Sequence, residues 1–130
     1  MRRLPVTNAT GNVCPATLGA DAGGLVLVVG GQRLPFAQAE ARAHVGRVCS
    51  VGMRPEALAA VEGDTPALSG TLTHAEYLGH ETLAHVALAG DGGTVVARLP
   101  GMPAMMVGAA LRLAPDVARV RLFDTNGNAL

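Results

Sequence analysis

The chain has 130 residues, ten basic and ten acidic side chains, and a formal net charge of zero at pH 7. This length is enough for one compact domain with its own hydrophobic core. All ten basic residues are arginines, and they never cluster beyond Arg2-Arg3, so no basic face for a phosphate backbone is expected. The only aromatic residues, Phe36, Tyr77 and Phe123, offer few platforms for stacked bases. We therefore expect no nucleic-acid partner.

Neither a membrane span nor a secretory signal is predicted. The longest apolar stretches are residues 25–29 and 102–114, and the second is interrupted by Pro103, Gly108 and Arg112. Both fall short of the roughly 20 apolar residues that a membrane helix needs. No apolar segment follows Arg2-Arg3, as a secretory signal would require. We expect a soluble, cytoplasmic protein.

The two cysteines, Cys14 and Cys49, lie outside any C-x-x-C pair. This spacing argues against a redox motif or a zinc motif. We interpret both as small buried apolar residues in a reducing compartment. A single disulfide between them stays open at this point.

Glycines and prolines divide the first half of the chain into short strands. Residues 13–18, 25–29 and 32–36 are predicted strands, joined by turns at 21–24 and at Gly30-Gly31. The Ala-rich residues 37–43 are the one helix-like stretch, which Gly46 ends. Residues 47–53 are expected to be extended, because the residue before Pro55 disfavours the helical region. Residues 56–58 then leave room for about one turn.

The second half continues the same pattern. A polar loop at 62–66 precedes a long hairpin, 68–78 with 81–88, about Gly79-His80, and a turn at 91–93 leads into a strand at 94–99. Alternation over 118–123 places Ala118, Val120 and Leu122 toward the core. Phe123 falls on the opposite face beside Arg119 and Arg121, where we expect it to cover a barrel end or contact another domain. Residues 124–127 form a closing turn.

These elements predict an all-β fold of small OB-like barrels with at most one short helix. We expect one accessory domain over residues 1–130. Two intertwined β subdomains, about 1–55 and about 56–130, are the alternative division of the chain.

Three segments, in order and in spacing, resemble the region that follows the nucleotide-binding domain in ATPase subunits of carbohydrate-type ABC importers. Val51-Gly-Met-Arg-Pro-Glu56 resembles the Gly-Ile-Arg-Pro-Glu segment of the maltose and glycerol-3-phosphate types. Glu76-Tyr-Leu-Gly79, with Glu81-Thr82, resembles the family's Glu-x-Leu-Gly followed by a polar pair. Val120-Arg-Leu-Phe-Asp124, with Gly127, resembles its closing Leu-Phe-Asp and turn glycine. The start, Met1-Arg-Arg-Leu-Pro5, is similar to the preceding Met-Asn-x-Leu.

The resemblance implies a TOBE or MOP-like domain that helps to hold two ATPase subunits together and that binds regulatory proteins in some members. The implied partners are the ATPase domain of the same protein, a second ATPase subunit, the membrane subunits indirectly, and a regulatory protein. The implied location is cytoplasmic, at the inner membrane through the transporter complex. The segment Thr82-Leu-Ala-His85 leans toward the glycerol-3-phosphate or related sugar branches. The structural or interface positions carried over are Arg54, Pro55, Glu56, Glu76, Leu78, Gly79, Phe123, Asp124 and Gly127.

Catalytic and nucleotide chemistry is not expected in this chain. A phosphate loop ends in Lys-Ser/Thr, and the sequence contains no lysine. Gly30-Gly-Gln-Arg33 has some likeness to the ABC signature Ser-Gly-Gly-Gln, but apolar alternation on both sides favours a hairpin turn. The resemblance therefore implies that the ATP-hydrolysing domain, with its ATP and Mg²⁺, lies outside this chain.

Three sets of polar side chains can be interpreted either as functional or as purely structural. Arg54 and Glu56 could clasp another domain, but we favour a bend set by Pro55. Glu76 could be a regulatory contact, but a solvated or turn-bonded carboxylate is favoured. A two-residue Gly79-His80 turn would pair Leu78 with Glu81 and place His74 opposite His85, with Glu76 on the same face. These three side chains are legitimate zinc or iron ligands. That register is inferred and no H-x-x-x-H spacing supports it, so we expect no bound metal.

A free-standing oxyanion-binding (molybdate) module of the MOP type is the alternative function. Such modules have a Ser-Ala-Arg-Asn start and a lysine near the anion. This sequence has neither.

Overall fold

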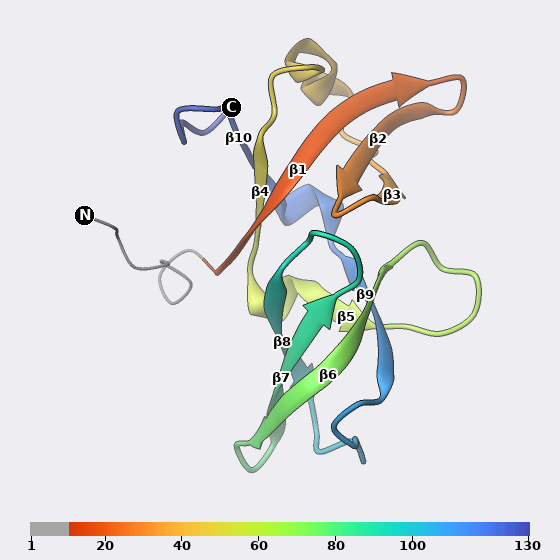
Figure 1. The fold of residues 1–130 in the computed structure, drawn as a ribbon, viewed down its shortest axis with the longest axis vertical. Helices are drawn as coiled ribbons and strands as arrows, with labels where there is room; N and C mark the ends of the chain where they lie inside the picture. Colours follow the sequence, from red (N-terminus) through yellow and green to blue (C-terminus); the bar gives the residue numbers. More distant parts are fainter. Residues whose placement is uncertain (1–10) are drawn as a thin grey trace.

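The computed structural model describes residues 11–130, which form two five-stranded antiparallel sheets, ordered β10-β4-β1-β2-β3 and β5-β9-β6-β7-β8. Figure 1 shows the first sheet above the second along the long axis of the molecule. The strands are β1 Asn12–Asp21, β2 Gly24–Val29, β3 Gln32–Pro35, β4 Ser50–Met53, β5 Leu58–Ala60, β6 Leu68–Tyr77, β7 Glu81–Leu88, β8 Thr94–Pro100, β9 Ala110–Pro115 and β10 Arg121–Phe123. Three 3₁₀ segments, η1 Ala39–His44, η2 Pro55–Ala57 and η3 Val117–Arg119, complete the elements.

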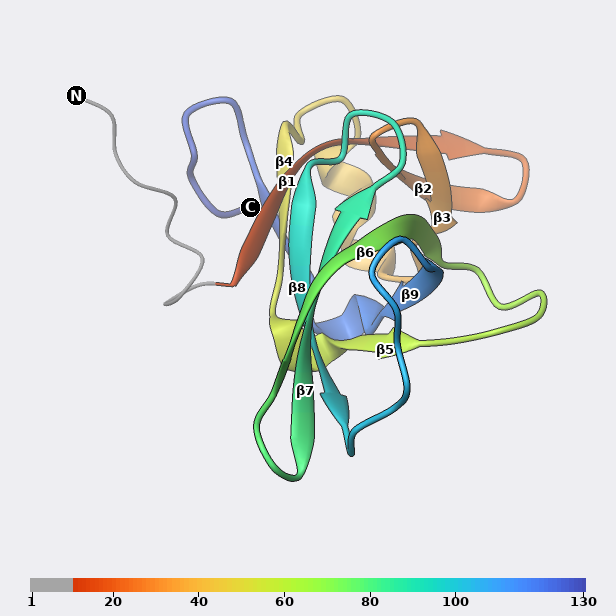
Figure 2. The same ribbon diagram turned by 60° about the horizontal axis from the view of Figure 1, so that its bottom comes forward.

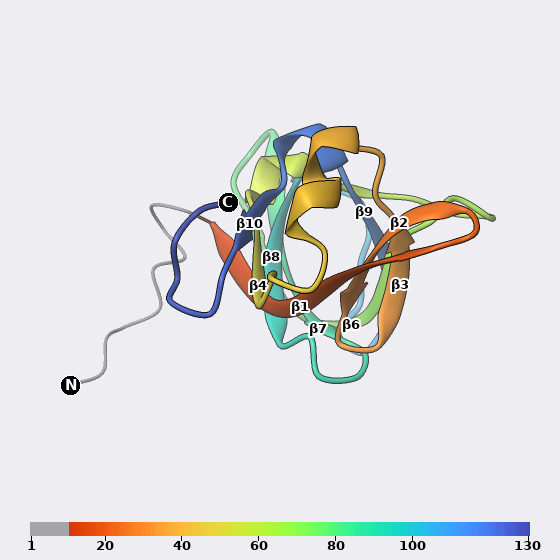
Figure 3. The same ribbon diagram turned by 90° about the horizontal axis from the view of Figure 1, so that it is seen from above.

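The long strand β1 organises the first sheet. Its first four residues pair with β4, and its remaining six, from Ala16 to Asp21, pair with β2. Figure 3 shows β1 crossing from the β4 side to the β2 side. The last strand, β10, closes the sheet against β4. The first sheet therefore takes one of its two edge strands from the far end of the chain.

The second sheet is built on the predicted hairpin, and β6, β7 and β8 lie side by side in Figure 2. Strand β9 pairs with both β6 and β5, and it was not expected from the sequence. Its residues belong to an Ala- and Met-rich stretch without clear alternation, so only the pairing partners fix it as a strand. Strand β5 was not expected either: it begins at Leu58, the last residue of the turn predicted for residues 56–58.

Both sheets contribute to one hydrophobic cluster, which includes Leu27 and Met53 from the first sheet and Val86 and Leu113 from the second. Val120 and Leu122 are buried as predicted. The prediction for Ala118 was wrong: it is exposed, because residues 117–119 form η3 and the alternating strand begins later.

Other local predictions had mixed outcomes. Gly30 and Gly31 both have positive φ, 60° and 85°, and form the expected two-residue turn between β2 and β3. The helix-like stretch forms the short 3₁₀ segment η1 and not an α-helix. No helix within residues 11–130 is long and apolar enough to cross a membrane. The resemblance at Met1-Arg-Arg-Leu-Pro5 lies outside the described residues.

The two cysteines differ in environment. Cys14 is 1% exposed, as predicted, whereas the prediction of burial for Cys49 was wrong, since it lies exposed just before β4. Both are free thiols in the part of the chain that the structure describes. Burial raises the pKa of the Cys14 thiol from 9.0 to about 11, because the anion loses its hydration inside the core.

Two amide side chains join the two sheets, and a third links the segment before η1 to η3. The buried Asn12 donates from Nδ2 to the Met53 carbonyl at 3.0 Å and to the Val96 carbonyl at 2.9 Å, and its Oδ1 accepts from the Val96 N–H at 2.8 Å. Gln32 bonds in the same two-way manner to the backbone of Ser69. The Gln38 amide donates to the Val117 carbonyl.

Glycine allows the two sheets to approach closely at one further point. A Cβ atom at Gly90 would lie 1.9 Å from the Gly30 carbonyl oxygen, and one at Gly30 would lie 2.3 Å from the Gly92 nitrogen. The turn between β2 and β3 therefore packs backbone against backbone on the turn that follows β7. Any side chain at these positions would separate the two turns.

We predict that Asn12→Ala destabilises the domain by at least about 2 kcal/mol, since each buried backbone group left without a partner costs roughly 1–3 kcal/mol. Chemical denaturation measures the change. Asn126→Ala is the matched control, because this exposed turn residue should change the free energy of unfolding by less than about 0.5 kcal/mol. Equal midpoints for the two variants would show that the Asn12 contacts contribute nothing.

We also predict that a thiol reagent at neutral pH modifies one cysteine per folded chain. The thiolate is the reactive species, and a raised pKa leaves buried Cys14 almost fully protonated. Ellman's reagent should therefore react rapidly with Cys49 alone, and with both thiols after denaturation. Cys49→Ser should abolish the rapid phase, and a rapid phase that persists in this variant would contradict the assignment.

Candidate functional site

The Arg54-Pro55-Glu56 segment forms the corner where the chain leaves the first sheet and enters the second. Arg54 is extended, at φ −72° and ψ 147°, Pro55 opens η2, and the Ala57 N–H donates to the Arg54 carbonyl at 2.9 Å. The Glu56 carboxylate lies 3.9 Å from the Arg119 guanidinium, with both side chains about half exposed. This is the bend that was favoured for Pro55.

Gly11 packs directly against this corner. Its φ is +84°, and a Cβ atom there would lie 2.8 Å from the Met53 carbonyl oxygen and 2.9 Å from the Arg54 Cα. Only glycine fits both the backbone conformation and the space. Gly11 and Asn12 together hold the corner from the first sheet.

A basic groove opens beside the corner. We define it by Arg54, Arg119, Arg121 and Phe123, which line a cavity of about 190 Å³ together with Val13 and Gly52. The Phe123 ring rests on Gly52, where a Cβ atom would lie 3.0 Å from the ring Cε2. Glu56 partly offsets the charge of Arg119. The groove thus combines an aromatic floor with positive charge, a combination suited to an anionic or acidic surface.

The sequence placed Phe123 on the face opposite Leu122, and the half-buried ring in the basic groove agrees with that placement. The alternation Arg119-Val120-Arg121-Leu122 also placed both arginines on the side of Phe123. The sequence did not bring Arg54 to the same place, and Arg119 and Arg121 were not among the predicted site residues.

Asp124 and Gly127 build the closing turn. The Asp124 carboxylate accepts from the N–H groups of Asn126 and Asn128, both at 2.9 Å, and the Gly127 N–H donates to the Asp124 carbonyl at 3.0 Å. Gly127 has φ +83°. Both residues therefore serve the geometry of the turn that follows β10.

Leu78 and Gly79 form the tip of the β6–β7 hairpin. The Leu78 N–H donates to the Glu81 carbonyl at 2.8 Å, and Gly79 has φ +92°. Tyr77 and Leu78 are 46% and 45% exposed. The tip is thus a tight turn that presents apolar side chains to solvent.

Glu76 lies farther down the same hairpin, among histidines. His74 pairs with His85 across the strands, as the sequence predicted. The Glu76 Oε2 atom lies 3.6 Å from His74 Nε2 and 3.4 Å from His85 Nε2. Glu76, His85 and Pro55 line a second groove, together with Asn12, Leu83, Val96 and Arg98. Glu76 therefore contacts side chains of the hairpin and not its turn.

Comparison with known proteins shows that most of the chain is similar in sequence to other proteins. The family model described as "TOBE domain" matches residues 51–123. The alpha-glucoside transport ATP-binding protein AglK of Rhizobium meliloti is 32% identical over 119 residues, 91% of this chain and 33% of the relative. The sn-glycerol-3-phosphate import ATP-binding protein UgpC of Cereibacter sphaeroides is 37% identical over 113 residues, 87% of this chain and 30% of the relative. The chain spans about a third of the length of these relatives.

Among solved structures, the cytoplasmic molybdate-binding protein ModG superimposes with a TM-score of 0.68 at 18% sequence identity. The match covers 88% of this chain and 96% of ModG, and it shows a shared fold. It confirms the expected all-β, OB-like class with barrel-like sheets. Since the family model matches more than half of the residues, the chain belongs to the TOBE domain family.

Proposed function

We propose that this domain is the accessory domain at the C-terminal end of the ATP-binding subunit of an ABC importer for sugars, glycerol-3-phosphate or related solutes. The observation that carries the proposal is the match to two transport ATP-binding proteins over nearly all of this chain but only a third of theirs. On this proposal residues 1–130 form one accessory domain, and the parent subunit is cytoplasmic, attached to the inner membrane through the transporter.

ATP does not fit the residues of this chain. Phosphate binding in such ATPases uses a glycine-rich loop ending in Lys-Ser/Thr, and the sequence has no lysine. The glycine pair at 30–31 forms a hairpin turn, with no helix behind it to bind phosphate. We assign no catalytic step to this domain and place ATP and Mg²⁺ in the ATPase domain of the parent protein.

The proposed role is to stabilise the dimer of ATP-binding subunits and to transmit regulation. The basic groove supports this role, because Arg54, Arg121 and Phe123 offer charge and aromatic area at one accessible place. We propose that an acidic surface of the ATPase domain or of the second subunit occupies it. Regulatory proteins that act on the transporter are further partners on this proposal.

We predict different roles for two adjacent side chains. Leu122→Ala should destabilise the isolated domain by about 2–5 kcal/mol, since Leu122 is 6% exposed in the core. Phe123→Ala should lower the free energy of unfolding by only about 1 kcal/mol, because in the isolated domain no partner covers the outer face of the ring. Chemical denaturation of both variants measures the difference. Equal destabilisation would make Phe123 a core residue and remove it from the proposed interface.

The Phe123→Ala variant also tests the proposed function in the full-length subunit. There Phe123→Ala should weaken retention of the subunit dimer or alter the regulation of transport, as read by size-exclusion chromatography and solute uptake. Wild-type behaviour of full-length Phe123→Ala would argue against the interface. The exposed-turn variant Asn126→Ala serves as the control.

The second candidate function, oxyanion binding, is favoured by the fold shared with ModG. We predict that neither molybdate nor Mg-ATP binds the domain at micromolar concentration, because the chain lacks lysine and the MOP start motif. Isothermal titration and thermal denaturation test both ligands. A saturable rise of Tm with molybdate, lost in Arg121→Ala, would instead make the basic groove an oxyanion site.

A further inference from the structure

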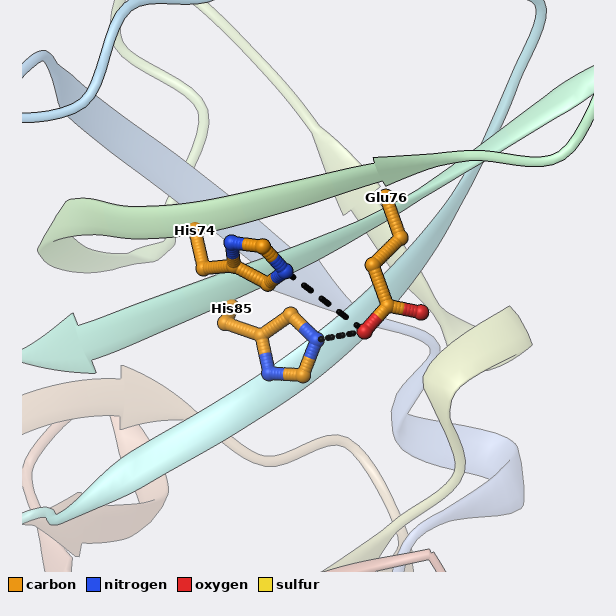
Figure 4. A group of neighbouring side chains, drawn as sticks. All are labelled: His74, Glu76 and His85. Atoms are coloured by element: carbon orange, nitrogen blue, oxygen red, sulfur yellow. Dashed lines mark ion pairs between the residues drawn. The ribbon is translucent and has the colours of Figure 1, made fainter.

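We propose that His74, Glu76 and His85 bind a divalent transition-metal ion of the Zn²⁺ type on the outer face of the second sheet. Figure 4 shows both imidazole rings directed toward the Glu76 carboxylate, two ligands from β6 and one from β7. One possible ligand atom from each residue lies within 4.8 Å of the others. The proposal rests on these three side chains alone and stands independently of the transporter role.

An irregularity in β6 puts the two β6 ligands on this face. The pairing with β7 shifts between Leu72 and His74, so Thr73 forms a bulge whose hydroxyl donates to the His85 carbonyl at 3.1 Å. Before the bulge, even-numbered residues such as Leu72 point into the core, and after it Ala75 packs against the core. Without the bulge, His74 and Glu76 would face inward. Bulges commonly re-aim side chains in this way next to functional sites.

The spacing is close to that of a zinc site. Tetrahedral Zn²⁺ has bonds of about 2.0–2.1 Å to imidazole and carboxylate, so neighbouring ligand atoms are about 3.3 Å apart. The separations from Glu76 Oε2 to the two Nε2 atoms are 3.4 Å and 3.6 Å. The rings of His74 and His85 have centroids 5.2 Å apart. Since the His74 side chain is 61% exposed, a small rotation of its ring can close the remaining gap.

The donor atoms also suit this class of ion. Two imidazoles and one carboxylate favour Zn²⁺ and its first-row neighbours, whereas Ca²⁺ and Mg²⁺ prefer oxygen ligands alone. Among residues 11–130, the buried His85 Nε2 atom has no hydrogen-bond partner. The Glu76 Oε2 atom lies 3.4 Å away without forming a hydrogen bond to it. A buried nitrogen that makes no hydrogen bond is costly, and a metal bond would satisfy it.

Three protein ligands leave a fourth tetrahedral position for water or an external ligand. The His85 and Glu76 side chains border the second groove, which leads toward Asn12 and Pro55 at the junction of the sheets. The nearby Arg98 guanidinium lies 3.4 Å from the Glu81 carboxylate, and this ion pair reduces its repulsion of a cation. Coordination would tie β6 to β7 beside the bulge and stabilise the folded state by mass action.

The test is a titration of the whole, tag-free, metal-free chain with ZnCl₂ by calorimetry and with Co²⁺ by visible absorption. We expect one saturable site per chain, the intense ligand-field bands of tetrahedral Co²⁺, and a rise of Tm with Zn²⁺. His85→Ala, His74→Ala and Glu76→Gln should each lower the affinity at least about tenfold. His80→Ala, in the turn of the same hairpin, should leave it unchanged.

All variants are compared in a Cys49→Ser background, so that the exposed thiol cannot bind the metal. The exposed His74→Ala variant should fold without metal as the parent does, by circular dichroism and Tm. No saturable binding, or binding that survives both His74→Ala and Glu76→Gln, would overturn the proposal. A loss of binding in His80→Ala would also overturn it, because the ion would then bind at the tip of the hairpin.

Discussion

The Asn12 side-chain amide is the contact on which the arrangement of the two sheets depends. Its two ends bond to Met53 at the end of β4 and to both backbone groups of Val96 in β8, so one side chain satisfies three backbone groups that the sheets leave unpaired. Buried polar groups are stable only when paired in this way. Gln32 makes a similar two-way contact from β3 to Ser69 in β6. Polar side chains, together with the shared apolar cluster, thus fix the relative position of the sheets.

The corner at Arg54-Pro55 follows from that junction. Pro55 starts η2, Gly11 leaves room for the turn, and the chain passes from β4 into β5. The two residues of the corner then line different grooves: Arg54 lies in the basic groove, and Pro55 lies beside Glu76 and His85. A single structural bend therefore shapes both the proposed partner interface and the groove beside the proposed metal site.

The two surfaces differ in what their chemistry accepts. The basic groove presents guanidinium groups and an aromatic ring in one lining, which suits carboxylates of a protein partner. The histidine-rich face of β6 and β7 presents two imidazole rings and a carboxylate, which suit a metal cation. Neither surface contains the parts of a nucleotide site. On the proposed function, this domain contributes contacts, and the rest of the subunit carries out the chemistry of transport.

The sequence alone determined the local features: the glycine turns at 30–31 and 79, the pairing of His74 with His85, the burial of Leu122, and the family segments near Arg54 and Phe123. These depend on spacing and turn chemistry over a few residues, which the order of amino acids encodes directly. Only the tertiary structure decided that 110–115 is a strand, that Ala118 leaves the core, and that Thr73 forms a bulge. It also decided that Asn12 meets Val96, 84 residues away, and that Arg54 meets Phe123. Contacts between distant segments arise from how the sheets pack, and no local pattern in the sequence specifies which partner a side chain will meet.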